Sequence, residues 1–272
     1  MMIWVYAAIA AVVVAAICFA VVLKQRLGIQ PRVLMLHSLR PRWLDISAVR
    51  GEQFEQLLQV IAECGLRVGT LEEAVADRGV VALTFDDGYD DLMQLLPLLE
   101  QKRIAITVFI PTAFIGKPNA WDNILLRDKR RHLDAVQIRQ LAAAGASFGS
   151  HGHSHGDLCA LPTAKLQREV VDSKAMLEEL TGREVRHLAF PFGRGEDRVI
   201  VAAKAAGFTH CWAAAPRRAF GSGCSRVAIN AFDSRFTMRA KLTGSLLGGI
   251  EVLKAAAISR CAQLTPLSRK IL

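Results

Sequence analysis

Two adjacent carboxylates, Asp86 and Asp87, directly follow the apolar run VVALTF. A short apolar run of this kind is typical of a buried strand. One carboxylate of such a pair can coordinate a metal ion, while its neighbour stays free as a base for the activated water. The alternative is an acidic helix start, in which the aspartates at 86–91 place negative charge against the positive end of the helix dipole.

Two histidines four positions apart, His151 and His155, follow another short apolar run, ASFGS. Two histidines and a carboxylate are a common ligand set for Zn²⁺ or a similar divalent ion. The spacing of four suits one face of a helix or a tight loop. With this pair downstream, we interpret Asp86 and Asp87 as a base and a ligand rather than as a helix start.

Two further polar signals end short apolar runs. His37 follows RVLML, and the turn Pro191, Phe192 and Gly193 follows HLA and Phe190. In parallel α/β barrels, catalytic groups collect at the carboxyl ends of the strands. We therefore expect all four signals to meet at one rim of such a barrel.

The apolar runs alternate with segments of helical periodicity along most of the chain, and most of these segments end at a glycine. This alternation predicts a mainly parallel sheet or barrel with helices outside. The expected strands are residues 32–36, 80–85, 104–110, 146–150, 187–190 and 208–213, and the expected helices are residues 53–64, 91–102, 133–144, 164–180 and 198–206.

Three motifs in order, TFDDG, SHxxxH and PFG, resemble those of the polysaccharide deacetylases of the NodB-homology type, carbohydrate esterase family 4. The resemblance covers roughly residues 32–235. The HS after RVLML and the run VALTFDDGY are similar to members found in exopolysaccharide gene clusters. The resemblance implies a distorted (β/α) barrel that hydrolyses N-acetyl groups from amino sugars with a divalent metal ion.

Carried over residue by residue, the resemblance makes Asp86 the general base. It makes Asp87, His151 and His155 the ligands of one divalent ion, Zn²⁺ in the first place, with Co²⁺, Ni²⁺ and Mn²⁺ as alternatives. The turn at residues 191–193 would contact the substrate, and a backbone N–H there would help to hold the oxyanion. Phe192 stands where the family often has tyrosine.

The chain departs from the family pattern in two places. The arginine that often orients the base has no clear match, and Arg186 and Arg194 are both candidates. The late leucine-rich motif with a catalytic histidine is absent, because the chain reads RVAINAFDS at residues 226–234. His37 is the natural substitute for the acid, since related permuted members place a histidine after the first strand.

The remaining histidines receive a structural interpretation. His132 lies in the charged run DKRRH and is predicted to be solvated, and His153 is predicted to be exposed between the two ligands. His187 and His210 lie at or near predicted strands and are expected to be hydrogen-bonded structural residues.

Both ends of the chain differ from its middle. Residues 3–23 are uninterrupted apolar sequence, long enough at about 1.5 Å per residue to cross the ~30 Å core of a bilayer. No basic residue precedes this run, which favours a retained anchor over a cleaved signal peptide or a buried helix. Residues 236–272 read as a basic amphipathic helix on a membrane surface, or as a helix packed on the barrel. The expected organisation is an anchor and linker at 1–30, a barrel at 31–235 and a tail at 236–272.

The formal net charge is +9, yet no nucleic-acid-binding motif is present, and a membrane-bound enzyme near anionic lipid explains the excess as well. The six scattered cysteines form no CxxC pair and favour free thiols in a reducing compartment. Lys24, Arg26 and Arg32 follow the apolar run, which favours a single-pass inner-membrane protein with its catalytic domain on the cytoplasmic face. The extracytoplasmic side, where most relatives work, is the alternative.

Together with this resemblance, the patterns lead us to expect a metal-dependent hydrolase that removes N-acetyl groups from amino sugars of a glycan or lipid-linked glycan. One alternative directs the same machinery at a non-sugar amide or at the formyl group of a lipid-linked sugar. The other alternative is a catalytically weak barrel that serves as a glycan-binding subunit.

Overall fold

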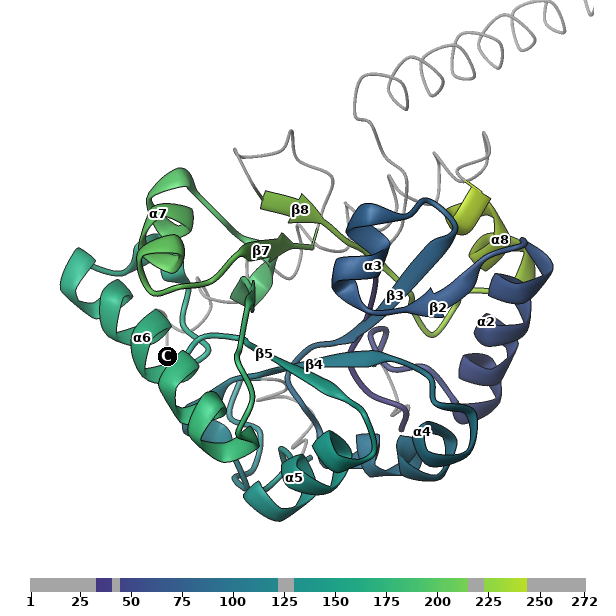
Figure 1. Ribbon diagram of the computed structural model, residues 1–272, viewed down its shortest axis with the longest axis horizontal. Coiled ribbons are helices and arrows are strands. Elements are labelled where there is room, and N and C mark those ends of the chain that lie inside the picture. The colour runs from purple at the N-terminus through teal and green to yellow at the C-terminus, as the bar shows by residue number, and fades with distance from the viewer. Residues whose placement is uncertain (1–32, 41–44, 122–129, 215–222, 244–272) are drawn as a thin grey trace, which may run out of the picture.

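Parallel strands form the centre of the computed structural model, which describes residues 33–40, 45–121, 130–214 and 223–243. The strands lie in the order β8-β7-β6-β5-β4-β3-β1-β9, and β2 pairs with the first half of β3. Figure 1 shows that the sheet is curved rather than flat. The strands are β1 (Val33–Leu36), β2 (Arg67–Gly69), β3 (Val80–Phe85), β4 (Ile106–Ile110), β5 (Ser147–Ser150), β6 (His187–Ala189), β7 (His210–Ala213), β8 (Gly223–Ser225) and β9 (Val227–Ala228).

A single segment joins the two ends of this sheet. β8 pairs with β7 at one end, and β9 pairs with β1 at the other end. Only Arg226 separates β8 from β9 in the sequence. The curved parallel sheet is therefore closed into a distorted barrel by residues 223–228, as expected from the alternation of strands and helices.

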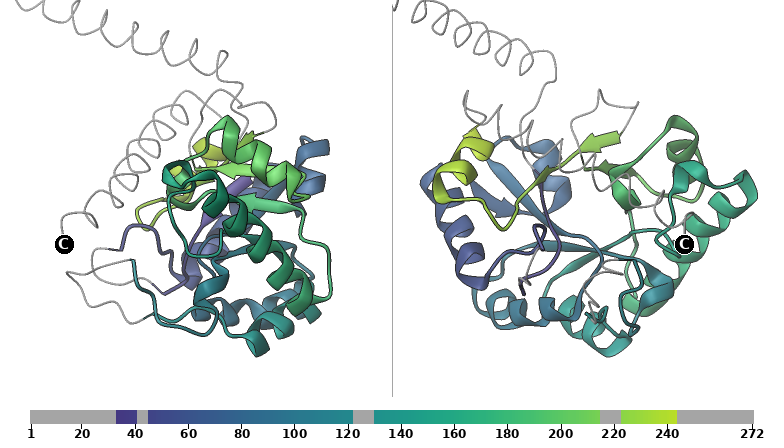
Figure 2. Two further views of the ribbon diagram at one scale, coloured as in Figure 1. Left: turned by 90° about the vertical axis from the view of Figure 1, so that its left-hand side faces the viewer. Right: turned by 180° about the vertical axis from the view of Figure 1, so that it is seen from behind.

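Most of the helices cover the outside of the curve, which Figure 2 shows from the side and from behind. Local sequence signals set their ends: Asp134 accepts hydrogen bonds from two N–H groups of the first turn of α5, and Gly182, at φ +65°, ends α6. The helices are α2 (Gly51–Glu63), α3 (Leu71–Ala76), α4 (Leu96–Lys102), α5 (Ala135–Ala143), α6 (Thr163–Thr181), α7 (Asp197–Ala205) and α8 (Arg235–Thr243), with short 3₁₀ turns η1 (Asp90–Leu95), η2 (Thr112–Phe114), η3 (Leu158–Ala160) and η4 (Pro191–Gly193).

Side chains alternate between the two faces of each strand and build two cores. On β3, Val81, Leu83 and Phe85 belong to the large cluster under the helices, whereas Val80 and Ala82 face the inside of the barrel. Phe109 of β4 and Trp212 of β7 fill that interior with them. By the same alternation, residue 86 continues on the inner face.

Gly149 of β5 makes room for one of these interior side chains. A Cβ at this position would lie 2.4 Å from the ring of Phe109, so a larger residue could not occupy this face of β5 without displacing the ring.

The predicted helix at residues 91–102 is wrong in its first half. The structure has the 3₁₀ turn η1 there, and α4 begins only at Leu96, with a proline in its first turn. Pro97 has no backbone N–H and is tolerated only at the start of an α-helix. The chain therefore cannot continue one α-helix through this position.

Two predictions about the chain ends lie outside the described residues: the membrane-spanning segment in residues 1–30 and most of the tail, residues 244–272. Within the described ranges, no helix combines the length and hydropathy that a membrane crossing requires. The start of the tail forms α8, which packs beside α2. Arg235 and Arg239 of α8 both form ion pairs with Glu63.

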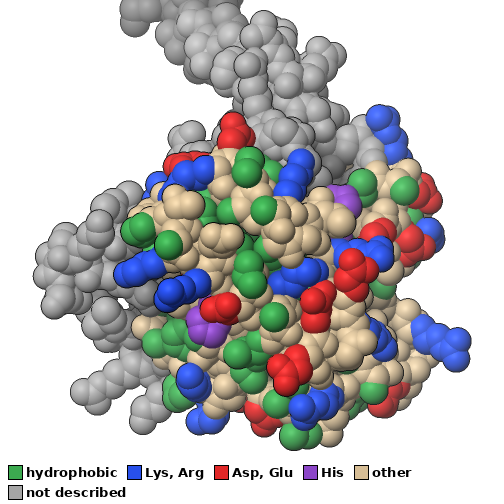
Figure 3. Space-filling view, turned by 60° about the vertical axis from the view of Figure 1, so that its left-hand side comes forward, with side chains coloured by type: hydrophobic (Ala, Val, Ile, Leu, Met, Phe, Trp, Pro, Cys, Tyr) green, Lys and Arg blue, Asp and Glu red, His purple; other side chains and the backbone are tan. Residues whose placement is uncertain are grey.

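The face that carries α6 and α7 shows acidic and basic side chains interspersed with isolated apolar ones (Figure 3). No continuous basic stripe crosses the described part of this face. Its charge pattern is that of an ordinary solvated surface.

Candidate metal and catalytic site

The two adjacent aspartates point in different directions because the chain turns sharply between them. The Asp86 N–H donates to the Leu36 carbonyl at 2.9 Å, which continues the ladder between β1 and β3 by one residue. Asp87 and Gly88 then adopt positive φ angles of 67° and 58°. A Cβ at Gly88 would lie 2.2 Å from the Ile110 side chain, so this turn requires glycine.

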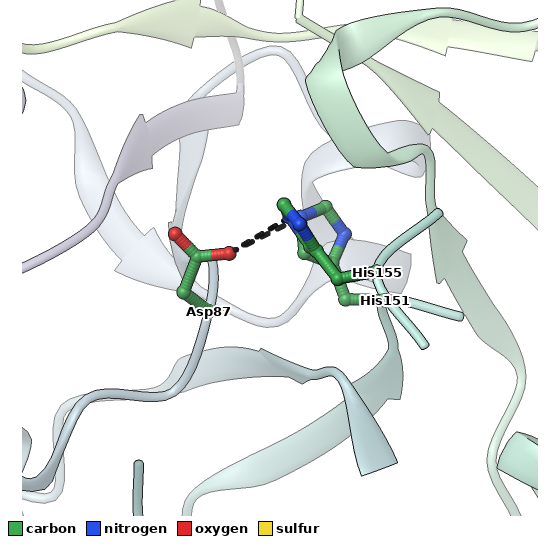
Figure 4. Close-up of side chains that lie close together, drawn as sticks. All are labelled: Asp87, His151 and His155. Carbon is green, nitrogen blue, oxygen red and sulfur yellow. Dashed lines mark ion pairs between the residues drawn. The ribbon is translucent and has the colours of Figure 1, made fainter. Parts of the chain in front are cut away.

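Three buried side chains, Asp87, His151 and His155, converge beyond the ends of β3 and β5 (Figure 4). The Nε2 atoms of His151 and His155 lie 3.6 Å and 3.1 Å from Asp87 Oδ1. The three ligand atoms all lie within 4.8 Å of one another. The sequence prediction that these residues come together is therefore confirmed by their geometry.

The protonation states of this cluster suit a bound cation. The Nδ1–H of His151 donates to the Ala189 carbonyl at 2.9 Å, which leaves Nε2 with a free lone pair that faces Asp87. Burial lowers the pKa of His151 to about 4, so the ring is neutral at neutral pH. Burial alone would raise the pKa of Asp87, but the nearby His155 and His151 outweigh it and lower that pKa, which keeps the carboxylate ionised.

The donor set fits a divalent metal ion. Asp87 Oδ1 is buried and accepts no hydrogen bond, although two ring nitrogens face it. An unsatisfied buried carboxylate oxygen is costly, and a cation bound between it and the two imidazole nitrogens would satisfy all three atoms.

Asp86 is held by an arginine that the sequence prediction missed. Arg226 Nη1 and Nη2 donate to the two carboxylate oxygens of Asp86 at 2.6 Å and 2.8 Å. Arg226 is 1% exposed, and Nη1 also donates to Thr84 Oγ1 at 3.2 Å. Burial would raise the pKa of Asp86, but the charge of Arg226 outweighs it, so the pKa is lowered and the carboxylate stays ionised.

Neither of the two expected arginines contacts Asp86. Arg186 pairs with Glu184 on the surface before β6, and Arg194 pairs with Asp157. The signal for Arg226 was present in RVAI: a charged residue at the start of a buried apolar run needs a charged partner. The partner could not be named from the sequence, because it lies 140 residues away.

His37 lies at the same rim. It follows β1 and is half-buried, and its charge is among those that lower the pKa values of Asp86 and Asp87. The structure therefore places His37 near both carboxylates, as the sequence predicted, and its role as an acid stays a prediction.

The turn Pro191–Gly193 forms one wall of the site. Phe192 and Gly193 both have positive φ angles, and the Phe192 ring lies 4.9 Å from the His155 ring. A Cβ at Gly193 would lie 2.3 Å from the Cβ of Ala214, which explains a glycine there. The N–H of Gly193 is engaged with the Phe190 carbonyl at 2.9 Å.

An aromatic residue that the sequence prediction missed forms the other wall. The ring of Trp121 stacks on His155 at 4.0 Å and 18°. The rings of Trp121 and Phe192 both lie against His155, which limits the orientations of its side chain. Trp121 belongs to no predicted element, so nothing in its local sequence placed it at the site.

The prediction that His132 is solvated is wrong. It is buried, and its Nδ1–H donates to the Asp87 carbonyl at 2.7 Å. The ring also lies 5.0 Å from Tyr89, to which residue 132 is bridged as in an antiparallel ladder. This pairing brings His132, the last residue of the charged run, onto the turn after β3, where it supports the backbone of Asp87.

The other histidines have structural partners. His153 is half-buried, and its Nδ1 lies 2.9 Å from Thr112 Oγ1. His187 accepts from the Trp212 indole N–H at Nδ1 and bonds Glu72 through Nε2, as a structural histidine at a strand start would.

The polysaccharide deacetylase family model matches residues 74–211. The chain is 28% identical over 141 residues to a chitooligosaccharide deacetylase of Sinorhizobium fredii, covering 50% of this chain and 58% of that protein. It is 29% identical over 126 residues to a chitin deacetylase of Colletotrichum lindemuthianum, covering 46% of each. The chain thus spans about half the length of these two curated relatives.

Two solved structures share the fold. IcaB from Ammonifex degensii superposes with a TM-score of 0.63 at 22% identity, over 76% of this chain and 94% of that one. The Streptococcus pyogenes deacetylase PplD, solved in complex with acetate, gives 0.65 at 21% identity, over 76% and 96%. In both cases the matched region covers nearly the whole length of the solved structure.

Proposed function

The chain belongs to the polysaccharide deacetylase family, and from that premise we propose that it removes N-acetyl groups from amino sugars of a glycan. The observation that carries this proposal is the pairing of one buried carboxylate with Arg226 directly beside a second carboxylate with two histidines. Chitin and chitooligosaccharide deacetylases among the relatives support an amino-sugar substrate.

Asp87, His151 and His155 would hold one divalent ion, with Zn²⁺ the best fit to two imidazoles and a carboxylate. When bound, such an ion polarises the amide carbonyl and makes water a better nucleophile at neutral pH.

Asp86 is the general base in this proposal. It removes a proton from the attacking water while the water oxygen bonds to the carbonyl carbon. Arg226 fixes the plane of the carboxylate with two hydrogen bonds and keeps it ionised. Thr84 and the Phe109 ring in turn hold the guanidinium.

The negative charge that develops on the carbonyl oxygen needs a hydrogen-bond donor, and we assign the Phe192 N–H to this role, beside Pro191 and Gly193. The Gly193 N–H is already used within the turn. His37 then gives a proton to the nitrogen as the carbon–nitrogen bond breaks, which yields acetate and a free amine.

The structure weakens one alternative, a glycan-binding barrel with little activity. That alternative rested partly on the lack of an arginine to orient the base. Arg226, which is 140 residues after Asp86 in the sequence, makes this contact. The chain also lacks the late catalytic histidine of the family pattern. In this mechanism His37 takes the role of that histidine as the acid.

We also propose that the enzyme is a single-pass inner-membrane protein that acts on a lipid-linked or membrane-proximal glycan, with its barrel on the cytoplasmic face. Support comes from the apolar residues 3–23 and from the basic residues Lys24, Arg26 and Arg32 that follow them. Reporter fusions at the C-terminus test this topology: a cytoplasmic reporter should be active, and an active periplasmic phosphatase would place the barrel outside.

The main experiment measures metal content and acetate release with the full-length protein in detergent. We expect about one divalent ion per chain and acetate release from a panel of N-acetylated chitooligosaccharides. The double variant His151→Ala/His155→Ala should lose both, while the control His153→Ala should keep both. Stoichiometric metal in the dialysed double variant would place the metal elsewhere, and a metal-loaded wild type that releases no acetate from any glycan would refute the function.

A further inference from the structure

The backbone on both sides of His37 is tied to other elements. The Leu36 carbonyl accepts from the Asp86 N–H, and the Ser38 carbonyl accepts from the Val49 N–H, both at 2.9 Å. Ser38 itself is fully buried, whereas His37 between these fixed residues is half-buried. The direction of the His37 ring therefore depends on how this short turn is held.

A carboxylate from the second half of the DDGYDD stretch holds the turn. Asp91, at the start of η1, accepts a short hydrogen bond from the Ser38 hydroxyl and a second from the Arg40 N–H at 3.0 Å, both at Oδ2. Ser38 precedes Asp91 by 53 residues, so this contact joins two rim loops rather than neighbours in the chain.

The burial of Asp91 at this position is energetically unfavourable. It is 3% exposed, and its second oxygen, Oδ1, has no hydrogen-bond partner. Burial raises the pKa of Asp91, against the opposing effects of Ser38 and of the Arg130 charge. A buried carboxylate with one unsatisfied oxygen destabilises the fold, so its presence here points to a role other than stability.

We propose that Asp91 is a positioning residue for His37. Through the Ser38 hydroxyl and the Arg40 amide, it fixes the turn that presents the His37 ring to Asp86 and Asp87. One stretch of six residues then supplies the base and a metal ligand at its start and orients the acid from its end. This inference rests on the proposed function, because it takes His37 as the acid of amide hydrolysis.

Steady-state kinetics of Asp91→Ala and Asp91→Asn test the proposal. The alanine variant should lower kcat about 10-fold or more, with KM and metal content nearly unchanged. The asparagine variant keeps an oxygen that accepts from Ser38 and Arg40, so it should recover most of kcat. Asp90→Ala is the matched control and should behave like wild type, because among the described residues Asp90 is hydrogen-bonded through its backbone N–H, to the Arg131 carbonyl, and not through its side chain.

A double-mutant cycle with His37→Gln separates positioning from general structural support. In that background, Asp91→Ala should cause little further loss of kcat, because the group that it orients is gone. An equal loss in both backgrounds, or an asparagine variant no better than alanine, would overturn the proposal.

Amide hydrogen exchange gives a readout that does not depend on activity. Asp91→Ala should speed exchange in the peptide that contains Ser38 and Arg40, while the peptide that contains His151 stays protected. Unchanged exchange at residues 37–40 would overturn the proposal even if activity fell. If the wild type deacetylates nothing, the proposed function fails, and faster exchange at Arg40 would still support the anchoring by Asp91.

Discussion

Asp86 and Asp87 are chemically identical neighbours that the structure makes different. Asp86 continues the inner face of β3 and meets Arg226, whereas the positive φ of Asp87 turns its carboxylate toward His151 and His155. Both are buried and both remain ionised, but one is paired with a guanidinium and the other faces two imidazole rings. The proposed division into base and ligand thus rests on backbone direction and on the partners.

The roles of Asp86 and Asp87 can be tested separately by replacing each carboxylate with an amide. Asp86→Asn should retain the metal ion and lose ~10²–10⁴-fold in kcat, because a general base typically contributes that much. Asp87→Asn should instead weaken metal binding, since a neutral amide replaces a charged ligand. Metal titration and kcat of both variants check this, and equal metal loss in the two would refute the assignment.

Arg226 is predicted to act through Asp86. Arg226→Lys keeps the charge but cannot make two parallel hydrogen bonds, so kcat should fall about 10- to 100-fold with metal content unchanged. Arg194→Lys, which alters an arginine paired with Asp157 outside the site, should stay near wild type. The measurement is kcat per metal-loaded molecule for the two variants and the wild type. If Arg226→Lys keeps wild-type kcat, a single hydrogen bond to Asp86 is enough.

The sequence located the residues whose signals are local. Asp87, His151 and His155 lie at strand ends with spacing that a metal site requires, and the structure brings them together. Arg226 escaped prediction because its partner is contacted only when the barrel closes. His132 was misassigned because a run of charged neighbours hides the fold-back pairing that buries it.

At the scale of elements, most strands were predicted, including the three-residue β6, but β2, β8 and β9 were not. The strand at 80–85 and the helix near 164–180 match β3 and α6 within one or two residues. β2, β8 and β9 have only two or three residues each, too few for any periodicity to identify them. Such strands form because neighbouring strands pair with them, so their existence is a property of the sheet.

One contact between elements predicts a pH effect on stability. Glu72 of α3 accepts from His187 of β6 at 2.8 Å, and this hydrogen bond lowers the pKa of Glu72 from 4.5 to about 2. The folded protein therefore binds this proton more weakly than the unfolded chain does. The contribution is fully present above pH 4.5 and is lost as the pH falls toward 2.

Urea unfolding between pH 5 and pH 3 measures this contribution. The wild type should lose more free energy of unfolding over this range than Glu72→Gln does, by about 1 kcal/mol at most, because the Glu72 side chain is 49% exposed and screened by solvent. Glu55→Gln, a change on the exposed side of α2, should follow the wild type. Parallel curves for wild type and Glu72→Gln would rule out the contribution.

At the scale of the whole molecule, closure of the barrel depends on the segment directly after β9. Lys241 of α8 is 1% exposed and bonds both oxygens of Asp233 and the Ala228 carbonyl. Gln53 of α2 donates to the carbonyls of residues 230, 231 and 233. These contacts fix the chain beyond β9 and therefore brace the segment that carries Arg226.

The Lys241–Asp233 pair is predicted to be a major stability element. Lys241→Met leaves a buried carboxylate unpaired and should cost about 3–5 kcal/mol, a Tm decrease of roughly 6–20 °C for a barrel of this size. The double variant Lys241→Met/Asp233→Asn removes both charges and should recover part of the loss. Thermal unfolding checks this, and an unchanged Tm in the single variant would show that the pair is dispensable.

Residues 223–228 join the two ends of the sheet, and they also leave the ribosome last among the strands. Asp86 precedes Arg226 by 140 residues, so at ~5–20 residues per second its carboxylate waits on the order of ten seconds for its partner. Because an unpaired charge resists burial, we expect the barrel interior to stay open until the segment that carries Arg226 arrives. We therefore expect a nascent chain that ends before Arg226 to lack the group that orients the Asp86 carboxylate.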